Sequence, residues 1–159
     1  MTHPILLPII AMMKWDILES KYIVNNDFLK VRNDKCVRPD GVIVKNYYSI
    51  EKPDVVIIGA FTPENDLILI EQYRHPVRSV DLELPAGYLE PNESLNAAAA
   101  RELLEETGFE AESLTELSSA FASAGNMTNK VHFFIGKKAK KIKAQNLDDT
   151  EDINIKILS

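Results

Sequence analysis

The sequence contains little cysteine and little histidine, and these scarcities exclude several kinds of chemistry. Cys36 is the only cysteine, so no internal disulfide can form. It also has no Cys or His partners at metal-binding spacing, which argues against a zinc site and suits a reducing cytoplasm. Among only three histidines, His75 has no nucleophile or orienting acid at a recognisable spacing. Ser-His-Asp catalysis is therefore not supported.

Basic residues and long apolar runs are also scarce. Lys and Arg total 18 against 24 Asp and Glu, a net charge of −6, which argues against nucleic acid as a partner. The apolar run at 4–13 is too short to span a bilayer, contains two prolines and lacks the basic flank of a signal peptide. We expect residues 1–14 to form an N-terminal extension, and the protein to be cytoplasmic with no membrane partner.

The remaining composition is that of a folded α/β protein. Segments 16–24, 28–32 and 42–48 are rich in Ile, Val and Tyr, and turn signals at 25–27, 33–34 and 39–41 separate them. They predict a small antiparallel element over 15–53. Segments 54–60 and 66–72 are apolar enough for buried strands of a central sheet. Further strands are predicted at 114–122, at 131–136 and from Ile153 onward.

One helix is predicted between Gly87 and Phe109. Asn92 or Ser94 can cap its start, the alanines at 97–100 favour helix, and Gly108 ends it. Helical periodicity places three acids within one arc and apolar residues opposite. The acids are Glu102, Glu105 and Glu106, and the expected apolar face is Ala97, Ala100, Leu103 and Leu104.

Three carboxylates on one face repel one another unless a cation lies between them. Hard oxygen ligands suit Mg²⁺ or Mn²⁺, so the helix predicts a divalent metal site. Arg101 precedes Glu105 by four residues, and its guanidinium can orient a carboxylate. On periodicity alone, an ordinary Glu-rich surface helix explains the same pattern.

The full spacing decides between these interpretations. Gly87 is followed after five residues by Glu93, after seven more by Arg101 and Glu102, and then by the remaining acids and Gly108. This pattern resembles the Nudix box at every specified position. The resemblance implies a Nudix-type α/β/α sandwich with a mixed central sheet and an N-terminal antiparallel β element. It also implies hydrolysis of a nucleoside diphosphate linked to another moiety.

Two further segments narrow the resemblance. EQYRHP at 71–76 and ELPAG at 83–87, with the N-terminal β element, resemble the ADP-ribose pyrophosphatase branch. In that branch the residue at Arg74 helps hold the diphosphate, and the carbonyl at Ala86 contributes to metal binding. Gly87 lets the backbone approach a metal closely. Ala124 departs from the branch, which usually has proline there, in a loop near the distal part of the substrate.

The resemblance assigns a role to each candidate residue. A carboxylate takes a proton from water that attacks phosphorus, and bound metal neutralises the phosphate oxygens. Glu102, Glu105 and Glu106, with the Ala86 carbonyl, are the expected metal ligands, and Glu105 is also counted as catalytic. Glu93 and Arg101 brace the site. The general base is expected in the acidic loop 147–152, because acids that bind metal are poor proton acceptors. By position before the Ile153 strand, Asp149 matches the family's loop acid most directly, and Glu151 is next.

Alternatives in substrate and class remain at this stage. A dinucleotide or nucleoside triphosphate keeps the mechanism and changes the pocket, whereas a non-catalytic nucleotide-sensing domain is disfavoured by the intact box acids. We expect 54–159 to be the catalytic domain, without the C-terminal helix of its relatives. The β element at 15–53 is too small to be stable alone, so we expect it to lie at a homodimer interface.

Overall fold

The computed structural model describes residues 13–27 and 29–159. The expected N-terminal extension at 1–14 therefore lies outside the described residues except for its last two, and Phe28 of the expected strand 28–32 lies outside them too. The chain divides into two compact units, one formed by the N-terminal part to Lys52 with Ala122–Thr128, the other by Pro53–Phe121 and Asn129–Ser159. Each unit is described by itself.

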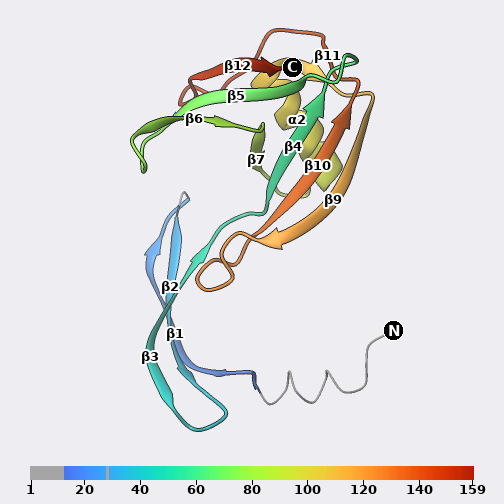
Figure 1. The fold of residues 1–159 in the computed structure, drawn as a ribbon. Helices are drawn as coiled ribbons and strands as arrows, with labels where there is room; N and C mark the ends of the chain where they lie inside the picture. The colour runs from blue at the N-terminus through green and yellow to red at the C-terminus, as the bar shows by residue number, and fades with distance from the viewer. Residues whose placement is uncertain (1–12, 28) are drawn as a thin grey trace, which may run out of the picture. The chain divides into compact units, whose positions relative to one another are not determined.

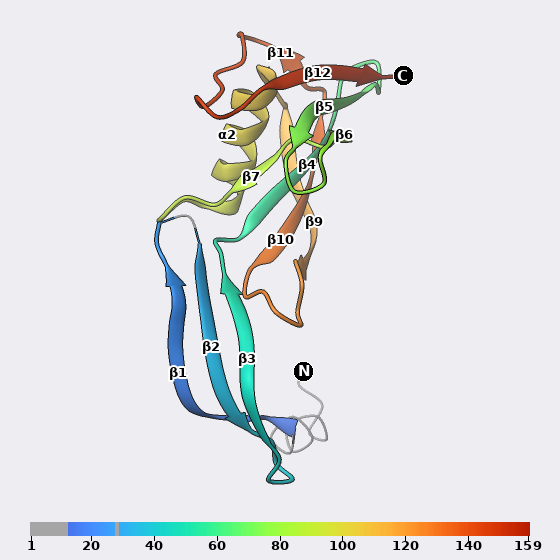
Figure 2. The same cartoon turned by 90° about the vertical axis from the view of Figure 1, so that its left-hand side faces the viewer.

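The first unit is a three-stranded antiparallel sheet in the order β1-β2-β3 (Figures 1 and 2). Its strands are β1 (Asp16–Asn25), β2 (Lys30–Val37) and β3 (Ile43–Glu51). The segment at 122–128 adds to the edge of β3, because the Ile50 N–H donates to the Asn126 carbonyl at 2.7 Å and the Thr128 N–H donates to the Ile50 carbonyl at 3.1 Å. The expected antiparallel N-terminal element is confirmed.

The turn expected at 33–34 is wrong, since β2 continues through it. Asp34 is buried, and its carboxylate accepts hydrogen bonds from the Ser20 hydroxyl at 2.6 Å and from Arg32 Nε at 2.9 Å. Ser20 lies opposite Asp34 on β1. Aspartate favours turns by local preference, but the carboxylate of Asp34 finds hydrogen-bond donors on its own strand and on the neighbouring strand, so it can lie within the sheet.

The second unit is built on a seven-stranded mixed sheet. Its main order is β12-β5-β4-β10-β9, with β6 paired to β5 and β7 paired to β4. β10 runs parallel to β4, and the other pairings are antiparallel, so the expected mixed sheet is confirmed. The strands are β4 (Val55–Phe61), β5 (Leu67–Arg74), β6 (Ser79–Glu83), β7 (Ala86–Tyr88), β9 (Ser113–Phe121), β10 (Lys130–Lys137) and β12 (Ile153–Leu158). A two-stranded pair, β8 (Phe109–Glu110) and β11 (Lys140–Lys141), completes the unit.

The core lies between this sheet and helix α2 (Leu95–Thr107) (Figure 1). Every second residue of β4 is fully buried, namely Val56, Ile58 and Ala60, as a half-covered strand requires. They pack with Leu103 of α2 and with buried side chains of β5 and β10. Each fully buried large aliphatic side chain contributes about 1.5–3 kcal/mol, so the helix is held by its packing on the sheet.

Both ends of α2 follow the expected signals. Of the two candidate caps, Ser94 is the one used, and its hydroxyl accepts a hydrogen bond from the Ala97 N–H at 3.3 Å. Gly108 ends the helix with a φ of 72°, and its N–H donates to the Leu104 carbonyl at 2.9 Å. A β-carbon there would overlap the Lys143 carbonyl oxygen, so glycine is required by conformation and by space. Within 13–27 and 29–159, no helix has the length and apolar character needed to cross a membrane.

Candidate active site

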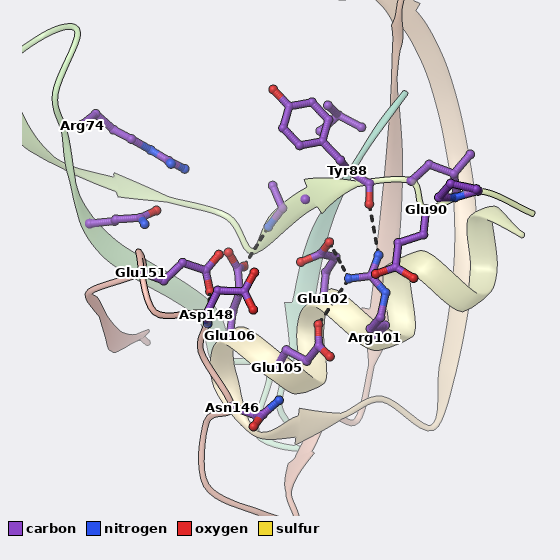
Figure 3. Close-up of a pocket in the computed structure, with 16 residues that line it drawn as sticks. Arg74, Tyr88, Glu90, Arg101, Glu102, Glu105, Glu106, Asn146, Asp148 and Glu151 are labelled. Carbon is purple, nitrogen blue, oxygen red and sulfur yellow. Dashed lines mark hydrogen bonds and ion pairs between the residues drawn. The ribbon is translucent and has the colours of Figure 1, made fainter. Parts of the chain in front are cut away.

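A pocket of about 610 Å³ lies in the second unit, beside α2 and β7 (Figure 3). Strand β5, strand β7 with the turn after it, α2 and the loop before β12 contribute its walls. The pocket is lined by Val55, Gln72, Arg74, Ala86, Gly87, Tyr88, Leu89, Glu90, Pro91, Arg101, Glu102, Glu105, Glu106, Asn146, Asp148 and Glu151. It therefore brings together acids from the helix and from the loop, with two arginines.

Arg101 is the centre of the hydrogen bonding in this pocket. Its Nε and Nη2 donate to the two oxygens of Glu93, both at 2.9 Å, and Nη2 also donates to the Tyr88 carbonyl at 3.0 Å. Its Nη1 donates to Glu102 at 2.8 Å and to Glu105 at 3.2 Å. These bonds, that to Glu93 above all, raise the pKa of Arg101, so the guanidinium stays charged. Its five N–H donors are therefore all used.

Glu93 connects the turn before the helix to Arg101. Its carboxylate also accepts a hydrogen bond from the Glu90 N–H at 3.1 Å, and the Arg101 guanidinium lowers its pKa. The side chain is mostly buried and remains ionised. This contact holds the chain after β7 against the helix.

The expected orientation of the helix is wrong. The structure buries Ala98, Ala99 and Leu103, whereas Ala97 and Ala100 are exposed and Leu104 is half-buried. Two of the three acids expected opposite that apolar face, Glu102 and Glu106, are buried as well. Periodicity grouped the residues by polarity, but both carboxylates lie inward, where Glu106 accepts a hydrogen bond from the Ala86 N–H of β7 and Glu102 accepts one from Arg101.

Glu106 and Glu102 occupy the space next to β7. Glu106 accepts a hydrogen bond from the Ala86 N–H at 2.9 Å, and burial raises the pKa of Glu106 to about 8. Burial also raises the pKa of Glu102, although Arg101 opposes the shift. A β-carbon on Gly87 would overlap the Glu102 carboxylate. Gly87 thus provides room for an acid, a reason that the sequence did not suggest.

The carboxylates fit a divalent metal by their chemistry, although they are not arranged as a finished cage. In the part of the chain that the structure describes, no three His, Cys, Asp or Glu side chains converge on one metal position. Arg101 instead holds Glu102 and Glu105. Burial raises the pKa of Glu106, so ionising this carboxyl is unfavourable without a nearby positive charge. A hard cation among these oxygens would supply this positive charge, in competition with Arg101.

The acidic loop places one of its two candidate bases in the pocket. Glu151 lines the pocket together with Asp148, a residue not singled out from the sequence, whereas Asp149 is not among the lining residues. The Asp148 N–H donates to the Glu151 carboxylate at 3.0 Å, and the Glu151 N–H donates to the Asp148 carbonyl at 2.9 Å. Figure 3 shows both side chains close to Glu106.

Arg74 lies at the far side of the pocket from Arg101 (Figure 3). Its Nε and Nη2 donate to the two oxygens of Glu83, each at 2.8 Å, and this pairing raises the pKa of Arg74. Glu83 was noted only as part of the ELPAG segment. The antiparallel pairing of β5 with β6 brings it to Arg74, and sequence spacing gave no signal for this contact.

Comparisons with known proteins agree with this geometry. Residues 51–158 match the NUDIX domain model, and residues 15–50 match the model of the nucleoside diphosphate sugar hydrolase N-terminal domain. The chain therefore belongs to the NUDIX family and is a hydrolase. Members of this family generally use divalent metal ions.

Individual relatives cover most of the chain. A methanol dehydrogenase activator from Bacillus methanolicus is 33% identical over 87% of this chain and 75% of its own length. An ADP-ribose pyrophosphatase from Bacillus subtilis (strain 168) is 33% identical over 67% of this chain, which spans 58% of that relative. The crystal structure of an ADP compounds hydrolase superposes with a TM-score of 0.81 at 25% identity, covering 92% of this chain and 79% of that one.

The buried acid of α2 predicts how stability depends on pH without metal. Because the folded-state pKa of Glu106 is raised to about 8, its contribution is fully present below the unfolded value and is lost as pH rises through about 8. Glu106→Gln does not titrate and keeps an acceptor for Ala86. In EDTA, the variant should gain roughly 1–3 kcal/mol over the wild type between pH 5 and pH 9, measured by urea unfolding. Glu64→Gln, at an exposed turn, is the control for losing one charge, and an equal gain there would contradict the assignment.

Proposed function

We propose that this protein hydrolyses the diphosphate bond of a nucleoside diphosphate linked to another moiety, with ADP-ribose or a related nucleotide sugar as substrate and Mg²⁺ or Mn²⁺ as cofactor. The observation that carries the proposal is one pocket containing the Arg101 carboxylate cluster, the loop acid Glu151 and, opposite them, Arg74. The names of the relatives, an ADP-ribose pyrophosphatase and an ADP compounds hydrolase, support this substrate class.

Arg74 is proposed to hold the diphosphate. Glu83 engages its Nε and Nη2 and fixes the plane of the guanidinium, while Nη1 takes no part in that pair. An arginine held along one edge can present another edge to a phosphate oxygen with little loss of side-chain entropy.

The helix acids are proposed to hold the metal. Glu102, Glu105 and Glu106, with the Ala86 carbonyl, would be its ligands, and Glu105 is the most exposed of these carboxylates. When bound, the metal would neutralise charge on the diphosphate oxygens. Arg101 bonds Glu102, Glu105 and the Tyr88 carbonyl, and Glu93 holds Arg101, so both residues are proposed to position the metal ligands.

The general base is proposed to be Glu151. Both candidates are carboxylates in a loop, where a group can approach the substrate and withdraw for product release. Glu151 lines the pocket beside Asp148, and Asp149 does not, which favours Glu151. Asp149, the first choice from the sequence, becomes the second candidate, because a loop can bring a different acid to the substrate during turnover.

The proposed reaction is tested by a panel of substrates with and without metal. With Mg²⁺, kcat/KM for ADP-ribose or another nucleotide sugar should exceed that for ATP and for dinucleotides, and EDTA should abolish turnover. Better hydrolysis of triphosphates would overturn the substrate class. No turnover of any diphosphate with Mg²⁺ or Mn²⁺ would favour a nucleotide-sensing domain.

The two loop acids give a direct test of the base. Glu151→Gln should lower kcat by roughly 10²–10⁴-fold while KM and metal affinity change little, because only proton acceptance is lost. Asp149→Asn is the matched control and should keep kcat within about threefold of the wild type. A reversed order of the two effects would assign the base to Asp149, and near-normal kcat in both would remove the base from this loop.

The domain boundary near 53, the cytoplasmic location and a homodimer are also proposals. Large apolar side chains of the β1–β3 sheet remain exposed, including Ile17 at 57% and Tyr48 at 51%. A three-stranded sheet with so little buried apolar surface needs a partner, and a second copy supplies a self-complementary one. The buried thiol of Cys36 needs no oxidising compartment.

The dimer predicts a clear effect of charge on this sheet. Ile17→Glu and Tyr48→Glu should each shift the protein from dimer to monomer in light scattering at micromolar concentration, because each would bury an unpaired carboxylate. Val77→Glu, at a site that is 63% exposed in the second unit, should leave the mass unchanged. A wild-type monomer, or dimers that persist in both variants, would contradict this interface.

A further inference from the structure

The C-terminal end of α2 is hydrogen-bonded to the chain that follows β11. The last turn of a helix leaves carbonyl groups without partners inside the helix. The Ile142 N–H donates to the Gly108 carbonyl at 2.9 Å, and the Asn146 N–H donates to the Glu105 carbonyl at 2.9 Å. The segment leading into the acidic loop is therefore tied to the same helical turn that carries Glu105 and Glu106.

Gln145 makes the contact that links this helix end to β12. Its Nε2 donates to the Glu106 carbonyl at 2.6 Å and to the Ile153 carbonyl at 3.1 Å. Ile153 is the first residue of β12, is buried, and pairs with Gln72 of β5. A primary amide has two N–H donors, and both are used here. One side chain thus joins the two ends of the loop 146–152 to each other and to the helix.

This arrangement limits where Glu151 can lie. The loop between the two anchored ends contains seven residues, and inside it Asp148 and Glu151 hydrogen-bond each other through backbone and side chain. The carboxylate of Glu151 lies near that of Glu106 in the pocket (Figure 3). The loop is short and its two ends are joined, so a shift of these ends would move the Glu151 carboxylate with them.

We propose that Gln145 is a positioning residue for the hydrolysis, fixing the loop acid Glu151 relative to the helix acids through the Glu106 and Ile153 carbonyls. The proposal rests on the proposed function for the role of Glu151. A displacement of about 1 Å at a reacting group can lower a rate by about 10²-fold, so losing this link should affect kcat far more than KM. Gln145 itself does not line the pocket.

The kinetic test compares variants in a double-mutant cycle. Gln145→Met keeps the length of the side chain and removes both donors, and it should lower kcat by roughly 10–100-fold with KM changed less than about threefold. In a Glu151→Gln background the same change should cost less than about threefold, since the acid that it positions is already lost. Lys143→Met, on an exposed side chain in the same segment, should leave kcat unchanged. An equal loss of kcat in both backgrounds, or no loss, would overturn the proposal.

A second measurement keeps the inference separate from the proposed function. Hydrogen exchange of the backbone amides of 148 and 151 should be faster in Gln145→Met than in the wild type, with β12 amides unchanged. Gln145→Asn retains both donors one methylene shorter and should be intermediate. If the wild type turns over no diphosphate, the proposed function fails while this readout still tests the link. Unchanged exchange at both positions would overturn the role of Gln145.

Discussion

The site depends on the hydrogen bonds that the Arg101 guanidinium donates. It joins the turn before the helix, through Glu93, to the helix acids Glu102 and Glu105 and to the backbone of Tyr88. Charge-assisted hydrogen bonds are roughly twice as strong as neutral ones, and the planar guanidinium fixes their directions. Without this cation, closely spaced carboxylates would repel one another in a partly buried pocket. Arg101 therefore allows the acids to be assembled before any metal binds.

The need to place carboxylates close together also explains which residues β7 carries. Glu106 can be buried because the Ala86 N–H points at it, and Glu102 can lie against β7 because Gly87 has no side chain. Two buried acids with raised pKa values reduce the stability of the fold when they ionise. A loss of stability of this kind is common in active sites, where it agrees with the metal-binding role proposed for these acids.

Sequence reasoning identified most elements of the fold, and it failed where distant residues decide the outcome. Ser94 and Gly108 act through local hydrogen bonds, so the ends of α2 were predictable. The turn expected at 33–34 failed because Ser20, on another strand, satisfies Asp34. The helix orientation failed for the same reason, since β7 supplies the Ala86 N–H to Glu106 and leaves room for Glu102 at Gly87.

Among the site residues, too, those in local contacts were predictable and those in long-range contacts were not. Spacing within one helix revealed Arg101 and its acids, whereas the contacts of Glu83 and Gln145 depend on strand pairing and on the end of a helix, which no local pattern specifies. Strands β6 and β7 were missed because they are short: β6 alternates between polar and apolar residues over only five positions, and β7 has three residues, too few for a periodic pattern.

Because the acidic loop is anchored at both ends, the position of Glu151 depends little on the other side chains of the loop. The hydrogen bonds at the two ends of the loop are accepted by the backbone carbonyls of Glu105, Glu106 and Ile153, which are present whatever side chains those residues carry. Gly108 makes this possible, because its left-handed conformation ends the helix where Lys143 approaches. Residues between the anchors can then vary without moving the ends of the loop. A fold built in this way can change the surroundings of the substrate while keeping the loop acid near the helix acids.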